Sequence, residues 1–88
     1  MPQEDLDEKN LIGQVVHYFD QIGVAVISLS KTLKVGDQIR FVGGETDFIQ
    51  EVISMEVDHE KIDQAKAKQE VGMKVDQRVR PGYRVYKA

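Results

Sequence analysis

Four cationic side chains and three tyrosines of this sequence are suited to binding an anionic ligand with an aromatic ring. The cationic residues belong to the C-terminal third and are Lys74, Arg78, Arg80 and Arg84. The tyrosines are Tyr18, Tyr83 and Tyr86. Guanidinium and ammonium groups neutralise phosphates, and a phenol ring stacks on an unpaired base with a gain of about 1–3 kcal/mol per base. Together these residue types predict a surface that contacts RNA.

The distribution of charge favours the same interpretation. The formal net charge is −3, which argues against binding to nucleic acid through bulk charge alone. Residues 61–88 nevertheless contain eight basic and three acidic side chains, whereas residues 1–60 contain four basic and twelve acidic ones. This asymmetry indicates a localised anionic partner. The alternative is an ordinary solvated surface, with Phe19 and one tyrosine closing the ends of the core and the arginines paired with acidic N-terminal residues.

The chain offers no pattern typical of a catalytic or metal site. Its two histidines, His17 and His59, lack further ligands at a suitable spacing, and the nearest set is Asp58-His59-Glu60. We expect His17 to be half-buried beside Val15 and His59 to be solvated in a loop. No serine or threonine has the neighbours of an activated nucleophile, and a small domain fills its interior with side chains. We therefore expect no enzymatic activity, no cofactor and no metal ion.

The length and composition predict one compact domain. Eighty-eight residues with 41% apolar side chains can bury a single core, which packing alone must stabilise because cysteine is absent. Residues 1–10 are acidic and polar, unlike a signal peptide, and no apolar run approaches the roughly 20 residues that span a bilayer. We expect a flexible acidic tail over residues 1–10, a folded domain over residues 11–88, a cytoplasmic location and no membrane partner.

Alternation of apolar and polar residues predicts short strands after residue 10. The first strand places Val15, His17 and Phe19 on one face. A turn over residues 20–23 then leads to a second strand over residues 24–29, which predicts a hairpin. The inward residues of the second strand are predicted to be Ala25, Ile27 and Leu29.

The middle of the sequence continues this alternation. Leu33 and Val35 are expected to plug one end of the core. Gly36-Asp37 predicts a tight turn, since glycine tolerates positive φ and aspartate accepts bonds from nearby backbone amides. A strand over residues 38–42 follows, and Gly43-Gly44 and Thr46-Asp47 are expected to interrupt the chain. The inward residues predicted here are Ile39 and Phe41, then Ile49, Ile53, Met55 and Val57 from one long strand over residues 48–57.

The last third returns to alternation after one interruption. Residues 58–69 predict at most one helical turn in a long connection, because Ile62 and Ala65 are three positions apart. Residues 70–76 predict a strand, Arg80-Pro81-Gly82 predicts a type II turn, and a final strand spans residues 83–86. The inward residues of the strand over 70–76 are predicted to be Val71, Met73 and Val75. These segments predict an all-β fold, namely a small closed six-stranded antiparallel Greek-key β-barrel.

The order of these segments resembles the second domain of elongation factor Tu, a barrel that recurs among translational GTPases. The likeness covers about residues 11–88, and its quoted segments are Leu33-Lys34-Val35-Gly36-Asp37-Gln38-Ile39, Val52-Ile53-Ser54-Met55, Val71-Gly72-Met73-Lys74-Val75 and the turn at Gly82. Other segments more closely resemble small stand-alone translation elongation factor-like proteins and the C-terminal barrel of collagenase-like peptidase proteins. These are Val16-His17-Tyr18-Phe19, Ile22-Gly23-Val24-Ala25-Val26 and Thr46-Asp47-Phe48.

The resemblance implies a binding domain related to translation factors that contacts RNA or the ribosome. It does not imply nucleotide binding, since the chain lacks the Gly-x-x-x-x-Gly-Lys-Ser/Thr loop and Gly43-Gly44 is followed by the acidic Glu45. The alternative function is a protein-interaction adaptor acting with a larger enzyme of the collagenase-like peptidase or RNA-modification type. Its face would consist of apolar residues out of phase with the core, namely Val24, Val26, Val42 and Val52.

Overall fold

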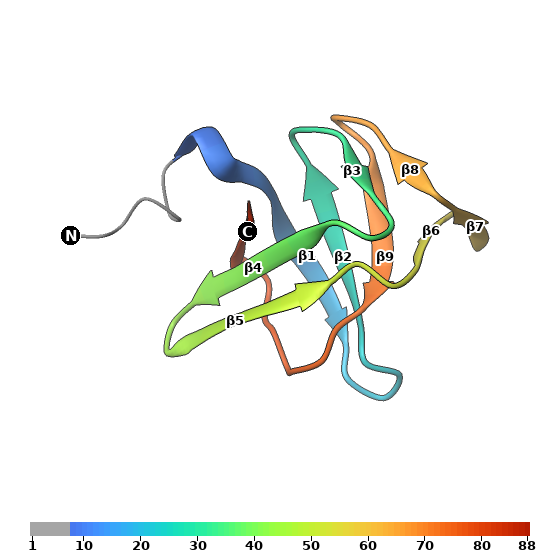
Figure 1. Ribbon diagram of the computed structural model, residues 1–88. Coiled ribbons are helices and arrows are strands. Elements are labelled where there is room, and N and C mark those ends of the chain that lie inside the picture. Colours follow the sequence, from blue (N-terminus) through green and yellow to red (C-terminus); the bar gives the residue numbers. More distant parts are fainter. Residues whose placement is uncertain (1–7) are drawn as a thin grey trace.

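The computed structural model describes residues 8–88, which form the all-β domain that the sequence predicts (Figure 1). A short 3-10 helix, η2 (Glu8–Asn10), precedes the strands. The strands are β1 (Leu11–Phe19), β2 (Val24–Leu29), β3 (Leu33–Lys34), β4 (Gln38–Gly43), β5 (Thr46–Glu51), β6 (Met55–Val57), β7 (Glu60–Ile62), β8 (Gln64–Ala65), β9 (Glu70–Lys74) and β10 (Arg84–Lys87). The expected acidic tail lies largely outside the described residues. Within them, no helix is long and apolar enough to cross a membrane.

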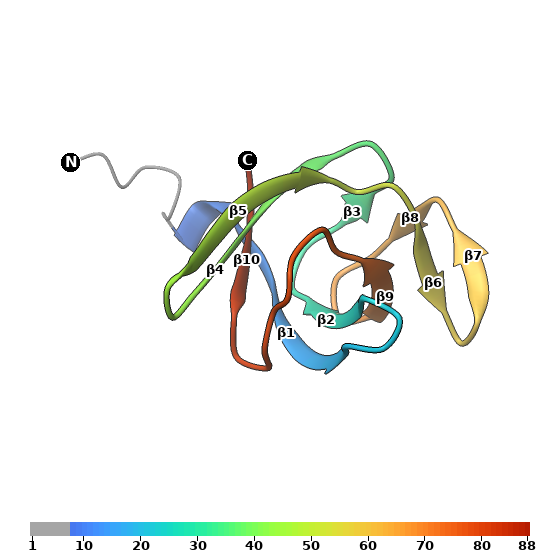
Figure 2. The same cartoon turned by 90° about the horizontal axis from the view of Figure 1, so that it is seen from below.

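The main sheet curls around the core. Its strand order is β5-β4-β10-β1-β2-β9-β6-β7, while β3 and β8 form a separate two-stranded ladder. The β4–β5 hairpin crosses one side of the core, and β1, β2 and β9 lie on the other side (Figure 2). β10 pairs with β1 and with β4, so the first and last strands are neighbours. The described part has ten strands rather than six, because β5 and β6 are separate and β3, β7 and β8 are additional.

A buried glutamine ties β5 to the chain that follows β9. The Gln50 side chain donates to the Lys74 carbonyl at 3.0 Å and accepts from the Asp76 amide at 2.8 Å. Gln50 is 5% exposed, and a buried polar group is stable only when it is hydrogen-bonded. Since β5 ends the strand order and Lys74 ends β9, these two bonds join parts of the sheet that share no ladder in the described chain.

The core follows the predicted alternation in β2, β4 and β9. Its confirmed inward residues are Ala25, Ile27, Leu29, Ile39, Phe41, Val71 and Met73. Phe41 stacks on Phe48 of the neighbouring strand, with ring centroids 5.0 Å apart. Such offset aromatic pairs add stability beyond the area they bury.

A β-bulge reverses the faces of β1 and corrects the prediction for its second half. The β1–β2 register passes over Val16, because Val15 pairs with Ile27 and His17 pairs with Val26. One extra residue shifts every following side chain to the opposite face. His17 and Phe19 are therefore exposed, and Tyr18 is half-buried instead. The expectation of a half-buried His17 is wrong; its ring lies against Phe19 at the surface, with centroids 4.3 Å apart.

The inward face of β5 is the opposite of the predicted one. Ile49 and Ile53 are 55% and 69% exposed, whereas Phe48, Gln50 and Val52 are buried. The hairpin register sets this phase, because Phe41 pairs with Phe48 and both rings must face the core. Thr46-Asp47 accordingly belongs to β5 rather than interrupting the chain. Met55 is buried as predicted, since residues 52–54 separate β5 from β6.

Residues 58–69 form strands rather than a helical turn. β6 and β7 are joined by Asp58 and His59, whose φ values are 53° and 68°. Two successive left-handed residues are typical of the tight turn that matches the twist of a β-hairpin. The β3–β8 ladder buries Leu33, but Val35 is 39% exposed and does not plug the core.

Two predicted turns are confirmed. Gly36 has a φ of 100°, and the Asp37 carboxylate accepts from the Lys34 amide at 3.0 Å. Gly82 has a φ of 98°, and the Tyr83 amide donates to the Arg80 carbonyl at 3.1 Å. In each case glycine occupies the backbone conformation that other residues rarely adopt.

Candidate functional site

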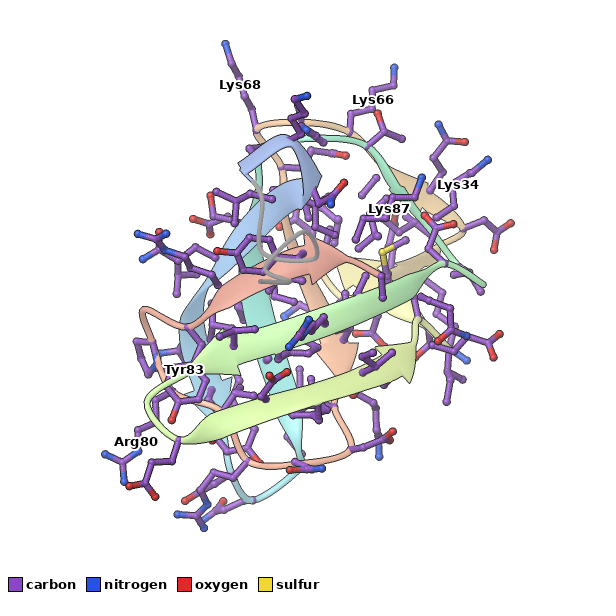
Figure 3. The ribbon with its side chains drawn as sticks, turned by 60° about the vertical axis from the view of Figure 1, so that its left-hand side comes forward. Lys34, Lys66, Lys68, Arg80, Tyr83 and Lys87 are labelled. Carbon is purple, nitrogen blue, oxygen red and sulfur yellow. The ribbon has the colours of Figure 1, made fainter. Side chains whose placement is uncertain are left out.

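A hollow beside the β4–β5 hairpin brings together three of the seven predicted binding residues. It has a volume of about 500 Å³, and we call it the arginine–tyrosine hollow. It is lined by Gly44, Glu45, Thr46, Arg78, Arg80 and Tyr83. Arg80 and Tyr83 lie together near the tip of the hairpin (Figure 3). A stacking surface and two cationic groups are therefore available to one ligand.

Tyr83 is held in this hollow by its backbone and by a glycine. The Val15 amide donates to the Tyr83 carbonyl at 2.8 Å, and the Gly82 amide donates to the Val15 carbonyl at 2.7 Å. The ring lies against Gly43, where an added Cβ would be 2.1 Å from the ring carbon Cδ1 of Tyr83. Only glycine leaves room for this packing. The phenol oxygen is 3.5 Å from the Thr46 hydroxyl.

The hollow carries unneutralised positive charge. Arg78 and Arg80 are exposed, and neither forms an ion pair with any other residue in the range 8–88. Glu45 lines the same hollow without pairing with them within that range. Two guanidinium groups beside one carboxylate leave a net positive site, which suits a phosphate or another anion.

The other four predicted residues lie elsewhere. Lys74 and Arg84 are exposed but line two separate hollows. Tyr18 is half-buried against the core. Tyr86 is only 4% exposed, so the prediction that its ring stacks on a base is wrong. The predicted set therefore forms no single surface.

Further lysines lie far from the arginine–tyrosine hollow. Figure 3 shows Lys34, Lys66, Lys68 and Lys87 well away from Arg80. Positive charge is thus distributed over several parts of the surface.

A second surface carries apolar rather than cationic side chains. It is a groove of about 390 Å³, which we call the apolar–acidic groove. It is lined by Phe19, Ile22, Val24, Val26, Glu56, Asp58, His59, Glu70 and Gly72. Val24 and Val26 of the predicted adaptor face thus lie here. Val52 is fully buried and Val42 is half-buried on β4, so the four predicted valines do not form one face.

Some residues of these two surfaces cannot be predicted from the sequence, because their position depends on tertiary packing. Thr46 enters the arginine–tyrosine hollow because β5 begins two residues earlier than predicted. Phe19 enters the groove because the bulge turns it outward, and Ile22 enters it from the β1–β2 turn. The adjacent glycines at 43 and 44 were the available signal, since a glycine within a strand often marks a close approach of another group.

The chain matches parts of proteins named as proteases. It is 41% identical over 76 residues to an uncharacterized protease of Methanocaldococcus jannaschii, a match that covers 85% of this chain and 19% of that protein. It is 29% identical over 82 residues to a collagenase of Porphyromonas gingivalis, covering 91% of this chain and 23% of that protein. The chain therefore spans about a fifth of the length of these relatives. No protein-family model matches the sequence.

Two solved structures show which domain of a longer protein the chain resembles. The selenomethionine variant of the C-terminal domain of a Geobacillus thermoleovorans protein, assigned to the U32 peptidases, superposes with a TM-score of 0.84 at 25% identity, covering 88% of this chain and 98% of that one. The solved part of that protein is its C-terminal domain, and this chain is similar to nearly the whole of it. A second structure of the same C-terminal domain has a TM-score of 0.85 at 24% identity, with coverages of 91% and 93%, and supports the fold.

These matches confirm the collagenase-like peptidase part of the resemblance seen in the sequence. The likeness to elongation factor Tu stays a prediction.

Proposed function

We propose that this chain is a non-enzymatic adaptor domain that acts with a larger protein of the U32-peptidase type. The observation that carries the proposal is the match to 98% of a solved C-terminal domain. A unit that recurs as a whole beside other domains has a core of its own and contributes a surface to its neighbours. The named proteases among the relatives indicate what kind of neighbour this is.

The exposed apolar residues support a protein-binding role. Phe19 is 45% exposed and Ile22 is 58% exposed, and both line the apolar–acidic groove. Contiguous apolar surface with a polar rim is typical of sites that bind proteins.

The experiment is crosslinking in the native cells with a tagged chain, followed by nuclease treatment and identification of the retained proteins. We expect a U32-type protein to remain bound after nuclease treatment. Loss of every protein partner on RNA removal, or retention of no U32-type protein, would contradict the adaptor function.

A second candidate function is contact with RNA through the arginine–tyrosine hollow. The observation that favours it is the convergence of Arg78, Arg80 and Tyr83 on one hollow. Replacing both arginines with alanine should weaken binding to a single-stranded RNA oligonucleotide. It should also reduce the salt slope by roughly 1.4, at about 0.7 per phosphate contact.

A matched control for the RNA experiment removes the same charge at the other end of the molecule. Lys66→Ala with Lys68→Ala changes the net charge equally, and these lysines lie far from Arg80 (Figure 3). Fluorescence anisotropy at low salt measures both variants. Equal weakening by the two double variants, or no affinity in the unsubstituted chain, would exclude the hollow as an RNA site.

A further inference from the structure

The apolar–acidic groove crosses the outer face of three neighbouring strands. Gly72 of β9 pairs with Val26 of β2 on one side and with Glu56 of β6 on the other. The neighbouring residues Val71 and Met73 point into the core, so position 72 faces outward. Because glycine has no side chain, the floor of the groove is open at the centre of this row.

The backbone conformation at position 72 does not require glycine. Gly72 is absent from the residues with positive φ, and an added Cβ would meet only Val24 Cγ1 at 3.5 Å, an ordinary contact. An alanine-sized side chain can therefore occupy this position without straining the strand. This contrasts with Gly43, where the Tyr83 ring occupies the space. The open floor at Gly72 is thus a property of the surface and not of the fold.

Apolar side chains form one wall of the groove. Val24 and Val26 are half-buried beside the glycine, and Phe19 and Ile22 extend the wall from the β1–β2 turn. Burial of such side chains by a partner is favourable because it removes apolar surface from water. A large apolar side chain placed over Gly72 would contact this wall.

Acidic side chains line the groove from β6, from the β6–β7 turn and from β9. Glu56, Asp58 and Glu70 line the groove, and none of them forms an ion pair with another residue in the part of the chain that the structure describes. Lys61 is the ladder partner of Glu56, and Lys74 is the ladder partner of Val24. Both lysines line an adjoining hollow that shares Gly72 with the groove, yet neither forms an ion pair with a carboxylate of the described residues. Unneutralised carboxylates beside apolar surface attract lysine and arginine of a partner and disfavour an acidic one.

We propose that the apolar–acidic groove binds an extended segment of a partner protein in which a large apolar side chain is flanked by lysine or arginine. This inference rests on the proposed adaptor function and names the chemistry of the segment bound. The apolar side chain lies over Gly72 against the valines, and the cationic side chains reach the carboxylates of Glu56, Asp58 and Glu70. The partner's cations supply the selectivity, and its apolar residue supplies most of the affinity.

The experiment is a nuclear magnetic resonance titration of the full chain, labelled with ¹⁵N, using two synthetic peptides. One is acetyl-Gly-Lys-Leu-Lys-Leu-Lys-Gly-amide, and the other has glutamate at each lysine position. We expect the lysine peptide to shift the amide signals of Val24, Val26 and Gly72, with affinity that falls as salt is added. The glutamate peptide should bind at least about 10-fold more weakly. Equal binding of both peptides, or shifts confined to other strands, would overturn the inference.

Substitutions test the groove directly. Gly72→Leu fills the floor and should weaken the lysine peptide at least about 10-fold, as expected when a partner side chain loses its pocket. Ile22→Ser removes part of the wall at a position that is 58% exposed. Its matched control is Ile53→Ser, which is 69% exposed and lines no part of the groove. Weakening by Ile22→Ser but not by Ile53→Ser supports the groove, even where Gly72→Leu impairs folding. Equal effects contradict it.

The failure of this inference can be distinguished from failure of the adaptor function. If the Gly72→Leu chain folds and retains a U32-type protein as well as the unsubstituted chain does, the groove is not the docking site and the adaptor function stands. If the lysine peptide binds the groove while no U32-type protein is retained, the adaptor function fails and the peptide-binding groove stands.

Discussion

Gln50 shows how a single polar side chain can hold a β-domain together. Its amide group serves two backbone groups, the Lys74 carbonyl and the Asp76 amide. No buried side-chain nitrogen or oxygen of the described residues lacks a partner, so the interior tolerates this amide because it is satisfied.

Replacing Gln50 should therefore lower the free energy of unfolding by more than the loss of its apolar contacts would. Gln50→Ala leaves a backbone carbonyl and a backbone amide without partners in a part-buried site, and we expect a loss of about 1–3 kcal/mol in the free energy of unfolding. Urea denaturation measures the loss. Gln38→Ala, at an exposed position of β4, is the control and should change stability by less than about 0.5 kcal/mol. Similar losses in both variants would contradict the structural role of Gln50.

Asp47 and Arg40 form a bidentate ion pair on the outer face of the hairpin. Arg40 Nε donates to Asp47 Oδ1 at 2.7 Å, and Nη2 donates to Oδ2 at 2.6 Å. The hydrogen bonds from Arg40, together with its charge, lower the pKa of Asp47 below 3.8 and outweigh the opposing effect of desolvation. Because the carboxylate is 48% exposed, solvent screens much of the attraction.

This pair makes a small pH-dependent contribution to stability. A lowered pKa in the folded state stabilises the fold above the ordinary pKa of aspartate, and that contribution disappears as the pH falls through the folded-state pKa. We expect Asp47→Asn to reduce stability at neutral pH by less than about 1 kcal/mol. Thermal unfolding between about pH 5 and 2 should show the two proteins converging at the acid end. A difference that persists undiminished at the lowest pH would contradict an ionic origin.

At the element scale, the predictable strands are those whose alternation is uninterrupted. β2, β4 and β9 follow their sequence pattern, and the turns at Gly36 and Gly82 follow from glycine and its neighbours. β1 departs because nothing in its residues announces the bulge at Val16. In β5, pairing of Phe48 with Phe41 turns Ile49 outward, although the apolar pattern of Ile49 and Ile53 predicted the opposite face. This pairing cannot be inferred from the residues of β5 alone.

The candidate site was predicted only in part for the same reason. Arg78, Arg80 and Tyr83 are close together in the sequence, and the turn over Arg80-Pro81-Gly82 brings them to the same hollow. This part of the site therefore followed from local structure. The burial of Tyr86 depends on β10 lying between two other strands. The apolar–acidic groove combines residues of four strands and two turns, and these residues are far apart in the chain. The tertiary arrangement of the strands determines which residues meet at such a surface.

The β6–β7 turn offers a test at this scale. His59 has a φ of 68°, a conformation that costs most residues about 1 kcal/mol and glycine little. His59→Gly should therefore raise the free energy of unfolding by about 0.5–1 kcal/mol, measured by urea denaturation. Ala67→Gly is the control, because Ala67 is not among the described residues with positive φ, and it should not stabilise. A loss of stability in both variants would contradict the strained turn.

At the scale of the whole molecule, β10 holds the two halves of the sheet together. It pairs with β1 on one side and with β4 on the other, and it buries Val85 and Tyr86. The β4–β5 hairpin has no other ladder to the rest of the main sheet in the described chain. The stability of the entire domain therefore depends on β10, which is only four residues long.

Deleting residues 84–88 should abolish cooperative folding. Without β10, β1 and β4 lose their shared partner and the core loses Val85 and Tyr86. We expect collapse of amide dispersion in the nuclear magnetic resonance spectrum. Arg84→Ala with Lys87→Ala keeps β10 but removes its exposed side chains, and it should change stability by less than about 0.5 kcal/mol. A dispersed spectrum from the shortened chain would contradict the central role of β10.

The position of β10 also bears on how the domain forms during synthesis. Among the described strands, β1 leaves the ribosome before the others, yet one of its two partners is β10, which follows all of them in the sequence. Until β10 emerges, the nascent chain exposes unpaired edges of β1 and β4, the kind of surface that aggregates or recruits chaperones. The sheet therefore reaches completion only after translation has passed Lys87, in one late step that inserts β10 between β4 and β1.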